Sequence, residues 1–232
     1  MKQPKKVKAP RKPRAAAEVL LQPQPAPIVM LSDPMGAPAE AIGSLRTRIQ
    51  SQHIQMGRRA LAICAASPDV GNTFVAVNLA VALSQIGIKT LLIDGNLRDP
   101  TVQNYFDIED KTGGLQKCLL SDAASVADYT NEDVLPDLDV IFAGEPTLRA
   151  QELLGSDRFP DLINSCLRDY EMTIADTPAA NRCADGLRIS SVLGFSLIVA
   201  RKHRTMVSDV RTLADQLRKE RVFVAGTVLN AY

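Results

Sequence analysis

The sequence predicts an α/β protein in which helices cover both faces of a mostly parallel sheet. Short apolar segments alternate along the chain with longer amphipathic or apolar segments, as in strand–helix–strand units. The apolar segment at residues 60–66 leads into a glycine-containing turn and a helix, which is the layout of a phosphate-binding loop. Two further apolar segments end in an acid, at Asp94 and at Asp176.

The amino-terminal residues differ in composition from the rest of the 232-residue chain. Seven cations precede the first acid: Lys2, Lys5, Lys6, Lys8, Arg11, Lys12 and Arg14. Without these seven, 20 of the 27 basic residues remain against 26 acidic residues, so the remainder carries a charge of −6. A proline-rich run follows, and such a composition cannot bury enough apolar surface to fold. We therefore expect a disordered basic tail at residues 1–30 and one folded domain at residues 31–232.

The tail suggests a peripheral contact with a membrane. An anionic inner leaflet would attract it by about 1 kcal/mol per basic residue near the surface. Nucleic acid would attract it as well, but the chain has no nucleic-acid-binding motif, and no nucleic-acid partner is expected. No segment reaches the roughly 18 apolar residues of a membrane span, and no signal peptide opens the chain. The sequence thus predicts a cytoplasmic protein.

The expected helices follow from apolar residues at helical spacing. They lie at residues 34–56, 73–86, 114–120, 123–129, 150–154, 158–169, 184–190 and 205–220. Pro38 suits the first turn of the first helix. The second helix is apolar on nearly all sides, so it should be buried, and Gly87 ends it. The last helix is amphipathic and should lie on the surface of the sheet.

The expected strands are short apolar runs bounded by turn-forming residues. They lie at residues 60–66, 89–94, 138–143, 171–176, 196–200 and 222–229. In parallel sheets of this kind, ligands bind outside the carboxyl ends of the strands. The strand ends at Ser67–Thr73, Asp94 and Asp176 should therefore line one crevice.

The turn and the start of the following helix are candidates for binding the phosphates of ATP or ADP. These residues are Ser67, Pro68, Asp69, Val70, Gly71, Asn72, Thr73 and Phe74. Backbone N–H groups in such a loop converge on an anion, and the helix N-terminus adds its dipole. Thr73, Asp94 and Asp176 are candidate ligands of Mg²⁺, and the two acids are also the candidate catalytic residues.

Two residues of the loop predict weak nucleotide binding. The lysine position of a working loop is Asn72, which brings no charge, and an earlier glycine position holds Asp69. At about 5 Å and an effective dielectric constant of about 20, Asp69 would repel each phosphate charge by about 3 kcal/mol before screening. Mg²⁺, a cation such as Arg98, or a neighbouring subunit would have to offset this loss. The alternative is a nucleotide fold that serves only as a scaffold.

Three stretches resemble the bacterial tyrosine kinases of polysaccharide biosynthesis, which belong to the P-loop NTPases. Residues 40–47 (EAIGSLRT) are similar to the amino-terminal helix of that family. Residues 91–100 (LLIDGNLRDP) are similar to its second nucleotide-binding motif, and residues 170–178 (YEMTIADTP) to its third. The resemblance covers the range from Ser32 to Asn230.

The resemblance implies a P-loop NTPase-like fold, with Asp94 and Asp176 serving Mg²⁺ and proton transfer. It implies an oligomer contact through Glu40 and Arg46. It also implies a membrane polysaccharide co-polymerase as the partner that would hold the chain at the inner membrane.

The chain departs from the family pattern at three motif positions and in its tail. Asn72 replaces the lysine, Asn96 replaces an acid of the second motif, and Gly43 replaces an arginine of the oligomer motif. A tyrosine-rich tail is missing, and Tyr232 is the only tyrosine near the end of the sequence.

We therefore predict a cytoplasmic tyrosine-kinase-like subunit of an exopolysaccharide polymerisation and export complex. It would regulate chain length or output, with impaired or lost phosphotransfer. The alternatives are an active ATP-dependent tyrosine autokinase, a partition- or septum-type ATPase, and a nucleotide-independent adaptor.

Overall fold

A seven-stranded sheet forms the centre of the computed structural model, which describes residues 27–108, 112–121 and 125–231. The strand order is β3-β4-β2-β5-β1-β6-β7. The strands are β1 (Ala60–Ala65), β2 (Thr90–Asp94), β3 (Asn131–Leu135), β4 (Leu138–Ile141), β5 (Met172–Asp176), β6 (Phe195–Arg201) and β7 (Phe223–Asn230). Five of the six neighbouring pairs are parallel, and β3 runs antiparallel to β4. The predicted mostly parallel sheet is confirmed.

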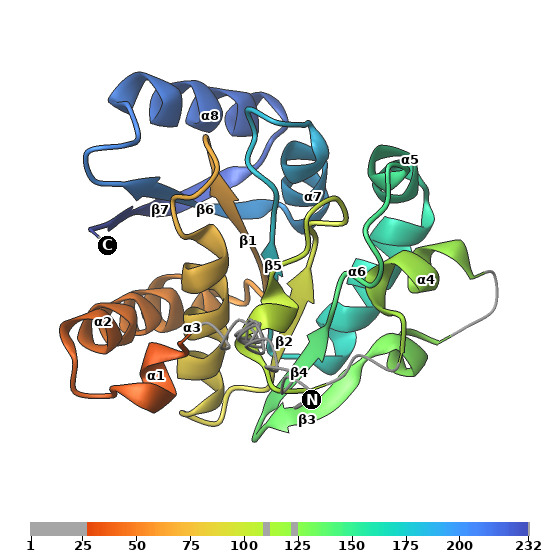
Figure 1. The fold of residues 1–232 in the computed structure, drawn as a ribbon, viewed down its shortest axis with the longest axis horizontal. Coiled ribbons are helices and arrows are strands. Elements are labelled where there is room, and N and C mark those ends of the chain that lie inside the picture. The colour runs from red at the N-terminus through yellow and green to blue at the C-terminus, as the bar shows by residue number, and fades with distance from the viewer. Residues whose placement is uncertain (1–26, 109–111, 122–124, 232) are drawn as a thin grey trace, which may run out of the picture.

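Helices cover both faces of this sheet, as predicted. They are α1 (Val29–Ser32), α2 (Ala37–Gln52), α3 (Asn72–Ser84), α4 (Gly114–Leu120), α5 (Ala150–Gly155), α6 (Arg158–Asp169), α7 (Asp185–Leu193) and α8 (Val207–Lys219). The described residues also form three short 3₁₀ helices, which are η1 (Ile54–Met56), η2 (Val102–Tyr105) and η3 (Val126–Tyr129). Helices α1–α3 lie on one face and α4–α8 on the other (Figure 1). Each face has its own buried apolar cluster.

Helix α3 is the buried helix that the sequence predicts. Every residue from 75 to 84 is buried, because the apolar side chains leave no polar face to turn toward water. It packs against β1, β2 and β5 on one side and α2 on the other. Full burial of a large apolar side chain contributes roughly 1.5–3 kcal/mol, so α3 anchors the loop that precedes it.

The first helix is shorter than predicted. It ends at Gln52, and the chain turns through His53 and the left-handed Gly57 (φ 75°) into β1. The buried His53 ring donates a hydrogen bond from Nε2 to the carbonyl oxygen of Ala60 (2.9 Å), and this contact competes with continuation of the helix. Residues 54–56 form the 3₁₀ helix η1 instead.

The edge strand β3 was not predicted, because it has no apolar run. Its sequence is NEDVL, and two of its five residues are exposed acids. Polar residues are tolerated here because an edge strand has one side open to water. The expected helix at 123–129 is the short η3 in its described part, and residues 122–124 lie outside the described range.

Helix α1 begins before the predicted domain boundary at residue 30. Helix α1 includes Val29 and Met30, and Met30 is buried against α3. Residues 1–26 of the predicted tail and Tyr232 lie outside the described residues. Among the helices described, none has the length and apolar character that a membrane crossing requires.

Candidate functional site

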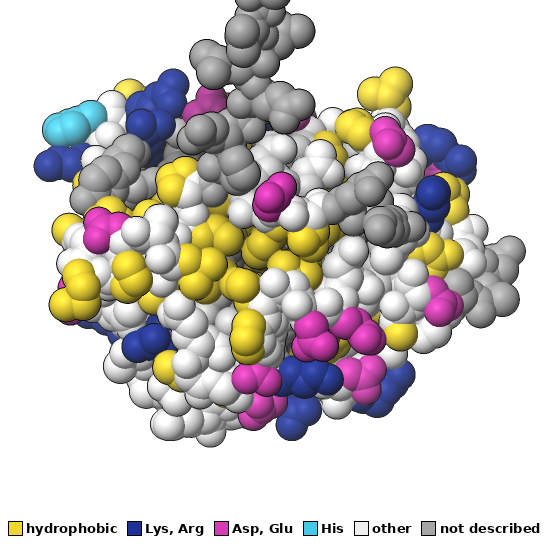
Figure 2. Space-filling model, turned by 60° about the horizontal axis from the view of Figure 1, so that its bottom comes forward, with side chains coloured by type: hydrophobic (Ala, Val, Ile, Leu, Met, Phe, Trp, Pro, Cys, Tyr) yellow, Lys and Arg dark blue, Asp and Glu magenta, His cyan; other side chains and the backbone are white. Residues whose placement is uncertain are grey.

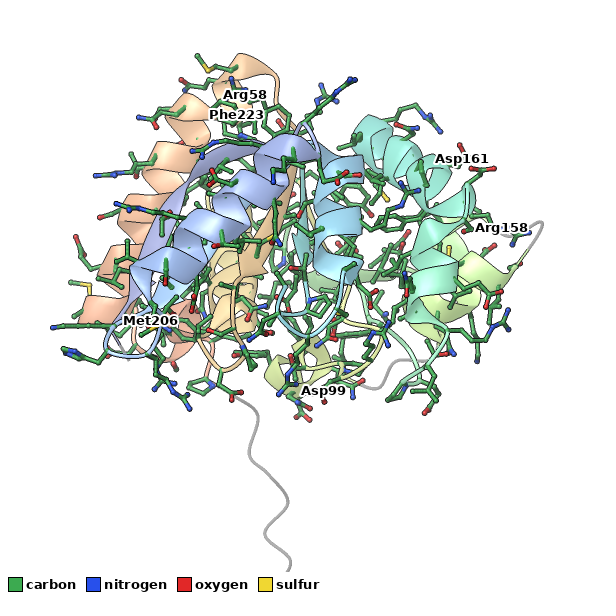
Figure 3. The ribbon with its side chains drawn as sticks, turned by 90° about the horizontal axis from the view of Figure 1, so that it is seen from above. Arg58, Asp99, Arg158, Asp161, Met206 and Phe223 are labelled. Carbon is green, nitrogen blue, oxygen red and sulfur yellow. The ribbon has the colours of Figure 1, made fainter. Side chains whose placement is uncertain are left out.

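Three strand ends meet at the carboxyl edge of the sheet, as the sequence predicts. Strand β5 lies between β1 and β2, and Asp94 and Asp176 are direct partners in the register of β2 and β5. The loop at residues 67–71 connects β1 to α3 beside them. A cavity of about 350 Å³ opens there and is lined by Asp69, Gly71–Phe74, Asn96, Arg98, Asp99, Thr101, Tyr105, Thr177, Pro178, Arg182 and Cys183, among others. Asp99 marks this edge in Figure 3, opposite Arg58 and Phe223.

The loop has the left-handed backbone of a tight anion-binding turn. Gly71 has a φ of 90°, and a Cβ at this position would collide with the side chain of Asn230. Asn230, at the end of β7, donates from Nδ2 to the carbonyl oxygen of Val70 (2.9 Å) and so holds the loop against the sheet. Asp69, which stands at the earlier glycine position of the loop, also has a positive φ of 58°, which aspartate tolerates better than most residues.

The loop presents free backbone donors. In the described part of the chain, the amide groups of residues 69–74 donate to no acceptor. These groups include the first turn of the 13-residue helix α3, where the helix dipole adds partial positive charge. Free backbone donors therefore lie where the sequence predicts a cradle for phosphate.

Asn72 is turned away from a phosphate and toward strand β5. Its Nδ2 donates to Oδ1 of Asp176 (3.0 Å) and to the carbonyl oxygen of Thr177 (2.6 Å). The two hydrogen bonds use both amide hydrogens, so Asn72 offers neither charge nor a spare donor to a ligand in this conformation.

The two candidate metal-binding acids are fully buried. Thr73 donates from Oγ1 to Oδ2 of Asp176 (2.6 Å), while Asp94 accepts from the backbone amides of Asn96, Thr101 and Val102 at 3.0–3.2 Å. Burial raises the pKa of Asp176, and the neighbouring Asp94 raises it further; burial is also the main cause of the raised pKa of Asp94. Two buried carboxylates side by side favour binding of a divalent metal ion, because the ion would offset their mutual repulsion.

Arg98, the cation named from the sequence, is already paired. Its Nε lies 2.6 Å from Oδ2 of Asp185, the buried first residue of α7. Arg182 approaches Asp99 at 4.0 Å, with both side chains largely exposed. The sequence patterns did not assign Tyr105, although burial and the nearby Asp176 raise its pKa to about 12 and its side chain lines the cavity.

The candidate oligomer residues lie outside this cavity. Glu40 is exposed in the first turn of α2. Arg46 donates from Nη1 to the carbonyl oxygen of Ala82 in α3 (3.4 Å), so it folds back on its own domain. The structure brings the loop and the two acids together and leaves Glu40 and Arg46 on a separate surface.

The residues present fit a nucleotide with Mg²⁺ in part. Free loop amides suit the phosphates, and the Thr73 hydroxyl with the Asp94 and Asp176 carboxylates supplies the oxygen ligands that Mg²⁺ prefers. The cationic partner of the phosphates is missing at Asn72.

The known proteins similar in sequence to this chain include tyrosine-protein kinases. No family model matches the chain. It is 32% identical over 192 residues to the putative tyrosine-protein kinase EpsB of Ralstonia solanacearum, a match that covers 83% of this chain and 25% of EpsB. This chain therefore spans about a quarter of the length of that relative.

Solved structures extend the comparison to the fold. The kinase domain of the Escherichia coli tyrosine kinase ETK has a TM-score of 0.81 at 29% identity, covering 90% of this chain and 82% of that one. The septum site-determining protein MinD from Pyrococcus horikoshii, complexed with Mg-ADP, has a TM-score of 0.65 at 22% identity, covering 75% and 70%, and this likeness concerns the fold alone. The fold is that of the P-loop NTPases, and over most of its length the chain is similar to the kinase domains of bacterial tyrosine kinases.

Proposed function

We propose that this chain is a cytoplasmic, tyrosine-kinase-like subunit of an exopolysaccharide polymerisation and export complex, with impaired or lost phosphotransfer. It docks on a membrane polysaccharide co-polymerase, lies peripherally at the inner membrane and regulates chain length or polymer output. The observation that carries the proposal is the position of Asn72. The residue that should contact phosphate instead bonds to Asp176 and Thr177.

The loop and the acids retain a binding role in this proposal. The amides of residues 69–74 would hold the phosphates of ATP or ADP, and Thr73, Asp94 and Asp176 would hold Mg²⁺. When bound, Mg²⁺ neutralises phosphate charge and orients the phosphates. Both oxygens of Asp176 accept hydrogen bonds, from Asn72 and Thr73, so a substrate hydroxyl would have to compete with these contacts to reach the carboxylate, which supports weak or absent catalysis.

The surface supports a protein partner. Figure 2 shows hydrophobic side chains gathered in the centre of the face that it presents, with charged side chains mostly around the margin. Contiguous apolar surface of this kind is typical of protein–protein contacts. We therefore expect the co-polymerase to cover apolar surface of the domain, with the basic tail adding an electrostatic attraction to the inner leaflet.

Co-expression with the co-polymerase tests the docking. The two proteins should co-purify in mild detergent, and the complex should persist in Asp94→Ala and Asp176→Ala variants because docking does not require catalysis. Failure of the wild-type chain to co-purify under native conditions would reject the docking proposal. An unrelated membrane protein expressed at the same level serves as the control.

Transfer of radiolabel from ATP tests the catalytic state. We expect little or no label on the chain, in contrast with an active kinase domain assayed in parallel. Label on a tyrosine that disappears in Asp94→Ala would instead support an active autokinase. Nucleotide-dependent dimerisation together with binding to DNA would support a partition-type ATPase.

A further inference from the structure

A basic turn lies against the phosphate-binding loop. Residues 201–204 (RKHR) begin with Arg201, the last residue of strand β6, and continue into a turn at the same carboxyl edge of the sheet. Arg201 donates from Nη1 to the carbonyl oxygen of Asp69 (2.9 Å), and Arg204 donates from Nη1 to the same oxygen (3.4 Å). Two positive charges therefore converge on the loop in which Asn72 replaces a lysine.

The turn is held in a defined conformation. The amide of Arg201 donates to Oγ1 of Thr205 (2.9 Å), and the amide of Thr205 donates to the carbonyl oxygen of Arg201 (2.9 Å). The amide of Lys202 donates to the carbonyl oxygen of Asn230 (2.8 Å), the residue whose side chain holds the loop. The turn and the loop are thus fixed to the same residue of β7.

Arg201 also lies beside a cavity that adjoins the loop. It lines a second cavity of about 470 Å³, together with Val29, Pro38, Asp69, Gly71, Phe74 and Asn230. Asp69, Gly71 and Phe74 line the first cavity as well, so the two cavities adjoin at the loop.

The donors of these two arginines are largely unused. Each guanidinium has five N–H donors. In the described residues neither Arg201 nor Arg204 lies within salt-bridge distance of an acid, and their side chains donate to one neutral carbonyl oxygen. Arg98 differs, because it is engaged by Asp185.

We propose that Arg201 and Arg204 supply the positive charge that the loop lacks at Asn72, and that binding of an oligophosphate at the loop depends on them. The proposal rests on the nucleotide site proposed above and adds the residues that make it work. Their charge would offset both the missing lysine and the repulsion from Asp69, whose carbonyl oxygen they already contact.

Calorimetry of the full chain with Mg-ADP and with inorganic tripolyphosphate tests this proposal. Removing one charge-assisted contact should weaken binding about 10-fold, so we expect this loss for Arg201→Gln or Arg204→Gln and a larger loss for the double variant. Arg201→Lys should recover part of the affinity, and the double variant should show a weaker dependence of Kd on salt. If the two arginines only stabilised the fold, Kd would depend on salt equally in the wild type and the double variant. Arg201→Lys would then bind no more tightly than Arg201→Gln.

Lys202→Gln is the matched control, because Lys202 is exposed on the same turn and, among the described residues, hydrogen-bonds to Asn230 of β7 through its backbone amide alone. Thermal unfolding confirms that each variant is folded. Unchanged binding in the folded Arg201→Gln/Arg204→Gln double variant, or an equal loss in Lys202→Gln, would overturn the proposal. The proposal would also be overturned if the wild type did not bind Mg-ADP or tripolyphosphate while Asn72→Lys did. Docking on the co-polymerase is measured separately, and its outcome does not depend on these binding results.

Discussion

Asn72 determines the chemical character of the candidate site. A lysine at this position would extend toward bound phosphate, whereas the shorter amide bonds to Asp176 and to the carbonyl oxygen of Thr177. These contacts join the helix that follows the loop to the end of β5 without a ligand. The same substitution thus removes a charge from the cradle and occupies one oxygen of a candidate metal ligand.

Restoring the lysine should restore affinity. We expect Asn72→Lys to bind Mg-ADP at least about 10-fold more tightly than the wild type, because a charged hydrogen bond to phosphate contributes roughly 1.5–3 kcal/mol. Isothermal calorimetry measures the change. Asn104→Lys is the control, since it adds the same charge to an exposed position lining the same cavity. An equal gain in both variants would show that net charge, not the loop position, controls binding.

The buried acids should make the stability of the ligand-free protein depend on pH. Their raised pKa values mean that the folded state holds protons more tightly than the unfolded state. Stability should therefore fall as the pH rises from about 4, the ordinary pKa of aspartate, through the raised pKa of Asp176, and the loss should be about 1.4 kcal/mol for each pH unit in this range. Mg²⁺ should oppose the fall, because it binds the charged carboxylates.

Urea denaturation at a series of pH values measures this effect. The difference between the wild type and Asp176→Asn isolates it from other groups. One such group is His53, whose pKa is lowered by burial and whose contribution has the opposite sign. Identical pH profiles for the wild type and Asp176→Asn would contradict the prediction.

At the scale of single elements, α3 links the amino-terminal segment to the loop. Its fully buried Asn78 accepts a hydrogen bond at Oδ1 from the amide of Met30 (3.3 Å) and donates from Nδ2 to the carbonyl oxygen of Phe74 (2.9 Å). Gln85 donates to the carbonyl oxygen of Met30 (3.2 Å). The buried polar side chain of Asn78 therefore positions α1 over the start of α3.

Removal of this side chain should detach α1. We expect Asn78→Ala to lower the free energy of unfolding by about 1–3 kcal/mol, because the buried amide of Met30 loses its acceptor. Denaturant unfolding measures the loss, and hydrogen exchange at Met30 should become faster. Asn78→Asp retains an acceptor and serves as the comparison. Unchanged exchange at Met30 in Asn78→Ala would show that apolar packing alone holds α1.

At the scale of the whole molecule, charge is divided between the tail and the body. Seven cations lie before Glu18, and the remainder has a net charge of −6. An anionic surface would therefore attract the tail and repel the body in general. This division favours contact with the inner leaflet through the tail while the domain contacts a protein partner.

Flotation with vesicles tests the tail. The 232-residue chain should bind vesicles rich in anionic lipid, and each of the seven cations changed to glutamine should weaken binding by about 1 kcal/mol. Binding should decrease with added salt. Vesicles of neutral lipid provide the control. Equal binding by a variant with all seven cations replaced would contradict the role of the tail.

The elements that could be predicted are those whose residues carry a local signal. The apolar run of β1, the continuous burial of α3 and the acids that end β2 and β5 follow from patterns of a few neighbouring residues, so the crevice could be located in advance. Edge strand β3 could not, because its stability comes from pairing with β4 and its own residues are polar. The early end of the first helix depends on the contact between His53 and Ala60.

By itself, the sequence determined the fold class, the position of the loop, the paired acids and the loss of the lysine. Only the tertiary structure decided what each polar group contacts. Asn72 meets Asp176 across 104 positions, and Arg201 meets Asp69 across 132. Arg98, in contrast, pairs with Asp185 and leaves the loop to other cations. Backbone conformation follows from near neighbours in the chain, whereas the partner of a long polar side chain depends on which distant strand the sheet places beside it.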